Sequence, residues 1–312
     1  MNRPESYHVP TLAVQRVTKT YAARSVRAND EVSLSVDGGT LLAVVGHNGA
    51  GKTTLLSQVI GVTRPDSGEI TLDGASLVAD PGLARRTASM MPQLHAPLTG
   101  VTPRQAVVAV ARLRGASSRD ARSAATRLFA ALDIEEFADR AGEKLSGGVR
   151  RLASLAMTAV RAPTIVLVDE PTNDVDPVRR PMIWSVLRRL ADDGRIVLVV
   201  THNLHEVQQT MDRFVLMQRG RVLMDSTPAT VAGALAPMTL TVHDARPGIE
   251  DSAPRCRDSV RRGADLELVV APDQVVAVAS WAVDLTRKAL ASSFALEPAS
   301  LSRLYERVTR AG

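Results

Sequence analysis

Residues 46–54 read Gly46-His47-Asn48-Gly49-Ala50-Gly51-Lys52-Thr53-Thr54, and the fold of the chain follows from them. They match the phosphate-loop pattern G-x-x-x-x-G-K-[S/T] at every fixed position. The apolar run 41–45 before the loop predicts a strand, and residues 53–60 predict the first turns of a helix. The order of strand, glycine loop and helix indicates a site for nucleotide phosphates rather than a glycine-rich turn with a surface lysine.

The residue types of this loop suit an anionic ligand. Glycines let backbone N–H groups close around phosphate oxygens with no Cβ in the way. The start of the helix adds its dipole and its unpaired N–H groups. We therefore expect Lys52 to reach the β- and γ-phosphates and the Thr53 hydroxyl to hold Mg²⁺.

Length and composition predict one large α/β domain and a smaller one. The chain has 312 residues, of which 45% are hydrophobic and only 3% aromatic, so the core consists mainly of aliphatic side chains. The net charge of +5 comes mostly from arginines spread along the whole chain. Because no basic cluster stands out, we expect no nucleic-acid partner; an anionic membrane surface or an acidic partner fits this charge as well.

The sequence favours a reducing compartment and no membrane span of its own. Cys256 is the single cysteine, which excludes an intrachain disulfide. Residues 1–6 have no apolar signal core, and no apolar run approaches the ~18 residues that span a bilayer. If the protein acts at a membrane, we expect another chain to cross it.

The first half of the chain predicts two β layers and a helical insertion. Residues 11–17 and 31–36 alternate as strands, which indicates an antiparallel layer beside a parallel nucleotide-binding sheet. Further strands are predicted at 69–72 and 87–92, the latter ending at Gln93. Helical spacing then predicts an all-helical insertion, placed at about residues 94–162.

The continuous apolar run 165–168 ends in two carboxylates, Asp169 and Glu170. Such a run predicts a strand buried on both faces, and the carboxyl end of such a strand is where α/β sheets bind ligands. A helix from Pro177 to about Ala191 is expected next, with Trp184 in the core. A second buried strand, 196–200, runs into His202, and residues 214–217 and 221–224 predict a hairpin.

The sequence predicts a domain boundary near residues 233–237, which divides the chain into 1–235 and 236–312. Beyond it, we expect a small α+β domain. Strands are predicted at 239–242 and 266–270, helices at 273–291 and 299–309, and an exposed loop at 244–263.

Five features follow one another in a fixed order: the phosphate loop, Gln93, the segment Leu145-Ser146-Gly147-Gly148, the pair Asp169-Glu170, and His202. Together they resemble the ATP-binding subunit of an ABC transporter over about residues 11–232. Phosphate-loop GTPases and kinases lack the Leu-Ser-Gly-Gly segment. The resemblance implies an α/β phosphate-loop ATPase core with an antiparallel β layer and a helical insertion, with ATP and Mg²⁺ as cofactors.

The resemblance also implies a role for each matching residue. Tyr21, if it is not a core tyrosine at a strand end, stacks on the adenine ring. The phosphates are held by the loop residues Gly46, His47, Asn48, Gly49, Ala50, Gly51, Lys52, Thr53 and Thr54. The Mg²⁺ ligands are Thr53, Gln93 and Asp169. The catalytic residues are Glu170 as general base, His202 at the γ-phosphate, Lys52 and Gln93.

In the family, the segment Ser146, Gly147 and Gly148 binds the γ-phosphate of the other subunit, at the start of a helix. The catalytic site is therefore completed only in a dimer, here expected to be a homodimer with two composite sites. Residues 173–176 match the loop that crosses between those sites, with Asp176 in the acidic position. The other implied partner is an integral-membrane permease.

The chain departs from the family at three positions near this segment. Val149 stands where glutamine is usual, and Leu152 and Met157 stand where arginine is frequent. We expect neighbouring polar contacts to be lost while the phosphate contact survives. The ATPase rate is therefore affected more than the mechanism.

Residues 298–305 are similar to the C-terminal end of ATPases from drug- and polyketide-exporting systems of the ABC-2 type, in which a separate permease forms the channel. The sequence thus predicts the ATPase subunit of an exporter at the cytoplasmic face of the membrane. One alternative is an ABC-type ATPase that drives a process other than transport. Another is a weakly catalytic nucleotide-binding regulatory or resistance module, for which the altered Val149 region is the only support.

Overall fold

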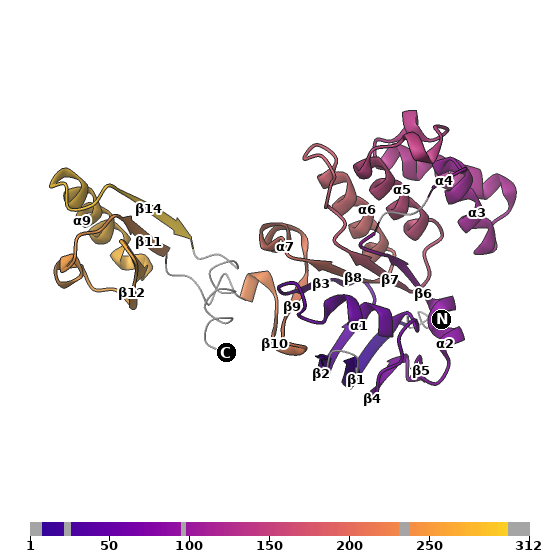
Figure 1. Ribbon diagram of the computed structural model, residues 1–312, viewed down its shortest axis with the longest axis horizontal. Helices are drawn as coiled ribbons and strands as arrows, with labels where there is room; N and C mark the ends of the chain where they lie inside the picture. The colour runs from indigo at the N-terminus through magenta and orange to yellow at the C-terminus, as the bar shows by residue number, and fades with distance from the viewer. Residues whose placement is uncertain (1–7, 22–25, 95–97, 231–237, 299–312) are drawn as a thin grey trace, which may run out of the picture. The chain divides into compact units, whose positions relative to one another are not determined.

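The computed structural model describes residues 8–21, 26–94, 98–230 and 238–298 (Figure 1). The chain divides into two compact units, residues 1–226 and 227–312, which are described separately below.

A six-stranded sheet forms the centre of the first unit, with strand order β10-β9-β3-β8-β7-β6. The strands are β3 (Leu41–Val45), β6 (Ala88–Met91), β7 (Ile165–Asp169), β8 (Ile196–Thr201), β9 (Arg213–Gln218) and β10 (Arg221–Ser226). Only β10 is antiparallel to its neighbour. Every residue of β3, β7 and β8 is buried, which confirms the reading of these apolar runs as strands covered on both faces.

The strand order places the predicted motifs at one edge of this sheet. β8 lies between β3 and β7, with Val45 opposite Thr201 and Asp169 opposite Val200. Since the three strands are parallel, the residues that follow them meet at the carboxyl edge. The phosphate loop, Glu170 and His202 therefore share this edge although the sequence separates them widely.

A second, antiparallel sheet packs beside the first and confirms the predicted β layer. Its order is β2-β1-β4-β5, with β1 (Thr11–Tyr21), β2 (Val26–Asp37), β4 (Ser67–Leu72) and β5 (Ala75–Ser76). Helix α1 (Lys52–Val59) lies between the two sheets (Figure 1). One apolar core joins Val14 and Val36 of the antiparallel sheet, Leu55 of α1, and Val44 and Leu167 of the parallel sheet.

Helices fill the predicted insertion between β6 and β7. They are α3 (Pro103–Leu113), α4 (Ser118–Ala131) and α5 (Gly147–Ala159), with single 3-10 turns at Glu135–Phe137 and Gly142–Lys144. Helix α3 begins with a capping box between Thr102 and Gln105. In Figure 1, α3 and α4 lie away from the antiparallel sheet, on the far side of the parallel sheet, while α5 also contacts β6 and β7 of the parallel sheet.

Three helices of the first unit differ from the prediction. Helix α6 (Arg180–Asp192) begins three residues after Pro177, because the Asp176 carboxylate accepts the Arg179 N–H in a turn that precedes the helix. Trp184 on α6 is buried, as expected. Helices α2 (Pro81–Thr87) and α7 (Leu204–Thr210) were not predicted, since seven residues are too few to show a helical period.

The second unit is a four-stranded antiparallel sheet with one helix. Its strands are β11 (Met238–His243), β12 (Asp258–Arg262), β13 (Asp265–Val270) and β14 (Ser293–Pro298), in the order β12-β13-β11-β14. Helix α9 (Val275–Arg287) packs through Val278, Ala282 and Leu285 on one face of the sheet. The order is that of a split βαββαβ unit in which the 3-10 turn Ile249–Ser252 replaces the first helix.

The loop predicted at 244–263 is wrong in part, because it contains that 3-10 turn and β12, and Ile249 is buried. Strand β12 reads Asp-Ser-Val-Arg-Arg, which lacks apolar alternation because β12 is an edge strand. Strand β14 was not predicted, and the helix predicted at 273–291 ends at Arg287. The predicted boundary at 233–237 and the predicted helix at 299–309 lie outside the described residues, as does nearly all of 298–305.

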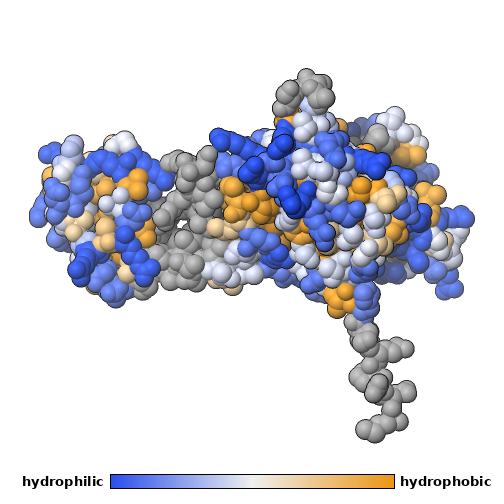
Figure 2. All heavy atoms as spheres, turned by 90° about the horizontal axis from the view of Figure 1, so that it is seen from below, coloured by the Kyte–Doolittle hydropathy of each residue, from blue (hydrophilic) through white to orange (hydrophobic). Residues whose placement is uncertain are grey.

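Hydrophilic residues dominate the face shown in Figure 2, and apolar residues surface there in small separate patches. Large exposed apolar side chains sit on different segments, among them Val62, Leu94, Leu113 and Val178. Within the described ranges, no helix is both long enough and apolar enough to cross a bilayer.

Deleting residues 237–312 is expected to leave a folded unit that binds nucleotide. The core between its two sheets contains only residues up to Met217, and all predicted site residues lie upstream of 227. Thermal unfolding and calorimetric titration with ADP check this, with the chain shortened by residues 299–312 alone as the control. Loss of ADP binding in the larger deletion and not in the control would contradict the prediction.

Candidate functional site

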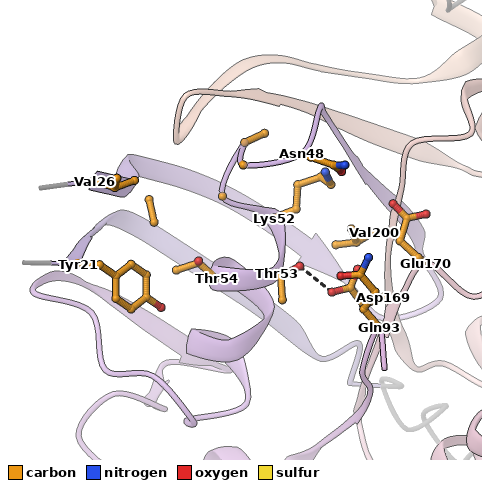
Figure 3. Close-up of a pocket in the computed structure, with 14 residues that line it drawn as sticks. Tyr21, Val26, Asn48, Lys52, Thr53, Thr54, Gln93, Asp169, Glu170 and Val200 are labelled. Atoms are coloured by element: carbon orange, nitrogen blue, oxygen red, sulfur yellow. Dashed lines mark hydrogen bonds between the residues drawn. The ribbon is translucent and has the colours of Figure 1, made fainter. Parts of the chain in front are cut away.

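A cleft of about 690 Å³ opens at the carboxyl edge of the parallel sheet (Figure 3). Its lining consists of Tyr21, Val26, Ala28, Asn48, Gly49, Ala50, Gly51, Lys52, Thr53, Thr54, Gln93, Asp169, Glu170 and Val200. In Figure 3, Tyr21 lies at one end of the cleft, and Gln93, Asp169 and Glu170 lie at the other. Tyr21 is 42% exposed, so it is not the core tyrosine that the sequence also allowed.

Backbone geometry requires glycine at two positions of the phosphate loop. Gly51, the residue before α1, has φ of 99°, and a Cβ there would lie 2.1 Å from the Ala28 carbonyl oxygen. A Cβ on Gly46 would lie 2.3 Å from the Met217 carbonyl oxygen. Neighbouring backbone therefore packs against the outside of the loop, and the first turn of α1 faces the cleft.

Lys52 places a cation inside the loop. Its side chain is buried, and Nζ donates to the carbonyl oxygens of Gly46 at 2.7 Å and His47 at 3.0 Å. Burial lowers the pKa of Lys52, whereas the nearby carboxylates of Glu170 and Asp169 act in the opposite direction. The ammonium group thus sits beside two acids and close to the loop amides, where an anionic ligand would meet it.

Thr53 and Asp169 provide adjacent oxygen ligands. The Thr53 hydroxyl donates to Asp169 Oδ2 at 2.7 Å, the contact drawn as a dashed line in Figure 3. Burial raises the pKa of Asp169, and the hydrogen bond from Thr53 opposes that shift. A hydroxyl and a carboxylate are hard oxygen donors of the kind that Mg²⁺ prefers, so the residues present fit the predicted ion.

Glu170 is held in a strained conformation at the end of β7. Its φ is 50°, and its N–H donates to the Val200 carbonyl oxygen at 2.8 Å. Oε1 lies 2.9 Å from His202 Nδ1, while the buried Oε2 has no hydrogen-bond partner within the described part of the chain. A buried carboxylate oxygen without a partner is costly, and it can accept a hydrogen bond from a water molecule.

His202 does not line the cleft. Its side chain is 62% exposed, and its link to the cleft runs through Glu170. Gly46 and His47 lie in the loop but likewise do not line the cleft.

Ser146, Gly147 and Gly148 line a different cavity, of about 670 Å³. Ser146 Oγ accepts the Val149 N–H at 3.3 Å and caps the start of α5. A Cβ on Gly148 would lie 2.6 Å from the Asp174 carbonyl oxygen, so the predicted crossing loop packs against the start of this helix. Within one chain, the structure therefore does not bring these residues to the cleft that contains Lys52 and Glu170.

Comparisons with known proteins identify relatives of this chain. A family model described as "ABC transporter" matches residues 29–173. The chain is 32% identical over 239 residues to the daunorubicin/doxorubicin resistance ATP-binding protein DrrA of Streptomyces peucetius, covering 76% of this chain and 72% of that protein. It is 33% identical over 223 residues to the Nod factor export ATP-binding protein I of Burkholderia thailandensis, with 72% and 73% covered.

The chain belongs to the ABC transporter ATP-binding family. Among solved structures, the dimeric MJ0796, a bacterial ABC transporter cassette, superposes with a TM-score of 0.64 at 25% identity, covering 70% of this chain and 98% of that one. The predicted family and fold class are confirmed. The cassette is an ATPase subunit of the kind found in drug and Nod factor export systems.

The structure adds two buried charges to the cassette that the sequence did not single out. Arg151 on α5 is buried and donates to the Pro92 carbonyl oxygen at 3.1 Å, directly before Gln93. Burial lowers the pKa of Arg151, against the attraction of Asp174, Asp169 and Glu170. It connects the helix that begins at Ser146 with the segment that carries Gln93. Its position just after the Leu-Ser-Gly-Gly segment was a signal that could have found it.

Glu206 on α7 is the second such charge. It is buried and accepts the Thr172 hydroxyl at 3.0 Å, and burial raises its pKa. Thr172 follows Glu170 by two residues. The hydrogen bond to Glu206 therefore fixes the segment that follows the predicted base. In the sequence, Glu206 is only an acidic residue four positions after His202. It lies on α7, which is too short to be predicted as a helix, so no pattern singled it out.

Val149 is largely buried. Its side chain is 7% exposed and joins an apolar cluster with Leu98, Leu145 and Ala153. Val149 also lines the cavity that contains Ser146. The valine is therefore a packing residue of the insertion at the edge of that cavity, and a glutamine there would place an amide against the apolar cluster.

Replacing Val149 by glutamine is expected to lower the melting temperature of the cassette. Burying an amide without partners costs about 1–3 kcal/mol, and each kcal/mol corresponds to roughly 2–4 °C in a unit of this size. Val178→Gln, the same change at an exposed valine, is the control and should leave the melting temperature nearly unchanged. ATP turnover should fall far more in Ser146→Arg than in Val149→Gln. Equal melting temperatures for Val149→Gln and the wild type would contradict the assignment.

Asp169→Asn is expected to stabilise the nucleotide-free cassette at pH 8. Burial raises the pKa of Asp169 above its value in the unfolded chain, so folding is favoured where Asp169 is protonated and this contribution is lost as the pH rises through the folded pKa. Asparagine removes that penalty, and its gain in melting temperature should shrink as the pH falls toward the ordinary pKa of an aspartate, where the wild-type Asp169 is protonated as well. Asp66→Asn is the control. The Lys19 hydrogen bond lowers the pKa of Asp66, so this substitution should change the melting temperature at pH 8 in the opposite direction, downward. A stability loss for Asp169→Asn that does not change with pH would contradict the expectation.

Proposed function

We propose that the chain binds Mg·ATP in the cleft beside Lys52, forms a homodimer, and drives export through a separate permease at the cytoplasmic face of the membrane. The separation of the two sites in one chain carries this proposal. The cleft holds the phosphate loop and the acids, whereas Ser146–Gly148 line another cavity. Two copies related by a twofold axis can set each cleft against the partner's Ser146 segment and so complete two sites.

The residues of the cleft have distinct tasks in this proposal. The loop amides and Lys52 Nζ hold the phosphates, Thr53 with Asp169 and Gln93 holds Mg²⁺, and Tyr21 stacks on the base. Mg²⁺ would supply positive charge against the phosphate oxygens. The tasks rest on the hydroxyl, carboxylate and ammonium groups that converge in Figure 3.

Glu170 is the proposed general base. Its Oε2 is buried and unpartnered within the described residues, so it can accept a proton from the attacking water. His202 holds the other carboxylate oxygen at 2.9 Å and thereby orients the acid. The strained φ of Glu170 fixes the side chain at the end of β7, where the Val200 carbonyl anchors its N–H.

Hydrolysis changes the dimer because the γ-phosphate is the group that both subunits contact. In this proposal Ser146 Oγ and the first N–H groups of α5 bind it from the partner, so its loss removes the contacts that favour the closed state. The Arg151 contact to Pro92 then links α5 to Gln93 within each chain. Leu94, next to Gln93, is 81% exposed and is a candidate contact for the permease.

The direction of transport and the type of system come from the relatives. Their names refer to daunorubicin and doxorubicin resistance and to Nod factor export, which supports export through an ABC-2 type system rather than uptake. The homodimer, the permease and the bound Mg²⁺ belong to the proposal.

Glu170→Gln tests the proposal. The amide keeps the shape of the carboxylate but accepts no proton, so ATP should bind and persist, turnover should stop, and the protein should elute as a dimer from a sizing column with ATP. Adding Lys52→Ala to this variant should return it to the elution volume of the monomer, because the phosphates lose their main cation. Hydrolysis by Glu170→Gln at the wild-type rate would show that another group is the base.

A further inference from the structure

Several carbonyl oxygens of the phosphate loop accept hydrogen bonds. Lys52 Nζ donates to those of Gly46 and His47. Two are also held from outside the loop: the Gly220 N–H donates to the Ala50 oxygen at 3.1 Å, and Asn29 Nδ2 donates to the Gly51 oxygen at 3.1 Å. The Gly51 oxygen accepts the Leu55 N–H of α1 as well, at 3.0 Å. Gly220 belongs to the turn between β9 and β10, and Asn29 belongs to β2.

These outer contacts determine where the loop amides point. A trans peptide is planar, and its C=O and N–H groups face opposite sides. When the Ala50 oxygen is held by Gly220, the N–H of Gly51 faces the other way. When the Gly51 oxygen is held by Asn29, the same is true for the N–H of Lys52. Gly51 and Lys52 both line the cleft, so these amides are oriented before a ligand arrives.

Asn29 is an unusual residue for its place. Its side chain is 0% exposed and lies outside the cleft lining. Nδ2 donates to Gly51, and Oδ1 has no partner within the residues that the structure describes. Burial of an amide that is only partly hydrogen-bonded is unfavourable for folding. An apolar side chain would avoid that cost, so the contact with Gly51 is the interaction that an amide uniquely provides here.

The hairpin turn is anchored to the residue after Asn29. The Asp30 N–H donates to the Gly220 carbonyl oxygen at 2.9 Å. The Asp30 carboxylate accepts Arg221 Nε at 2.6 Å and Arg27 Nη1 at 2.8 Å. Two consecutive residues of β2 therefore stabilise the phosphate loop. Asn29 contacts it directly, and Asp30 holds the Gly220 turn that contacts it.

We infer that Asn29 is a positioning residue for nucleotide phosphates, which keeps the amide of Lys52 turned toward the cleft. It touches no ligand itself. Pre-oriented N–H dipoles need no reorganisation when an anion binds, so loss of the support weakens binding. The inference rests on nucleotide binding by the phosphate loop. The loop amides would bind the phosphates equally in the ground state and in the transition state. Loss of their support should therefore raise KM and leave kcat unchanged.

Two substitutions of similar size test the inference in the full-length chain. Asn29→Leu removes the donor, and Asn29→Asp replaces it by an acceptor. Both should weaken ADP binding about three- to tenfold by calorimetry and raise KM for ATP by a similar factor, with kcat nearly unchanged. The matched control is Thr158→Val, which removes a buried hydroxyl that donates to the Ser154 carbonyl at 3.0 Å, far along α5. It should lower the melting temperature without changing ADP affinity.

Each outcome decides the question. ADP affinity close to wild type in folded Asn29→Leu and Asn29→Asp, or an equal loss in Thr158→Val, would overturn the inference. So would a loss confined to kcat. Measurements are repeated at 10 °C to keep destabilised variants folded; failure of both Asn29 variants to fold there would make Asn29 a folding residue instead. A wild-type chain that binds no ADP would count against the nucleotide site itself.

Discussion

The hydrogen bond from Thr53 to Asp169 joins residues that lie 116 positions apart, and the rest of the site depends on it. It connects the first turn of α1 with the end of β7, so that the phosphate loop and the acids share one edge of the sheet. The bond forms because β8 alone separates β3 from β7 and all three strands run in parallel. Burial of these strands on both faces gives the acids a well-packed base.

Burial also makes the site electrostatically costly. Lys52, Arg151, Asp169 and Glu170 are all buried, and burial opposes the charged form of Lys52, Arg151 and Asp169. Replacing buried charged groups by neutral or apolar ones is often neutral or stabilising. These charges are therefore explained by nucleotide binding rather than by stability.

Within one chain, the Ser146 segment and the cleft with Lys52 are separate, and the insertion explains why. The apolar cluster around Val149 holds α5 within the insertion, and the Ser146 end of that helix lines its own cavity. The glycine at 148 allows the Asp174 carbonyl to approach the same helix start. The start of α5 is thus held in place by apolar packing and by a close backbone approach, as the phosphate loop is.

The sequence by itself determined the local parts of this protein. The phosphate loop, the buried strands around 41–45, 165–169 and 196–201, the helical insertion and the acid pair all have patterns within a few residues, set by glycine geometry and by continuous apolar runs. Strand β12, an edge strand with polar residues, and the seven-residue helices α2 and α7 have no such pattern.

Only the tertiary structure decided which polar groups are buried and what they hold. Asn29 in β2 and Arg151 in α5 look like ordinary polar residues in the sequence, yet one supports the Gly51 peptide and the other the carbonyl of Pro92. Val149 looks like a lost interface contact but packs inside the insertion. Asn29 and Arg151 contact partners that are distant in the chain, and Val149 packs against Leu98 as well as its own helix. These environments depend on the packing of whole elements, which a local pattern does not contain.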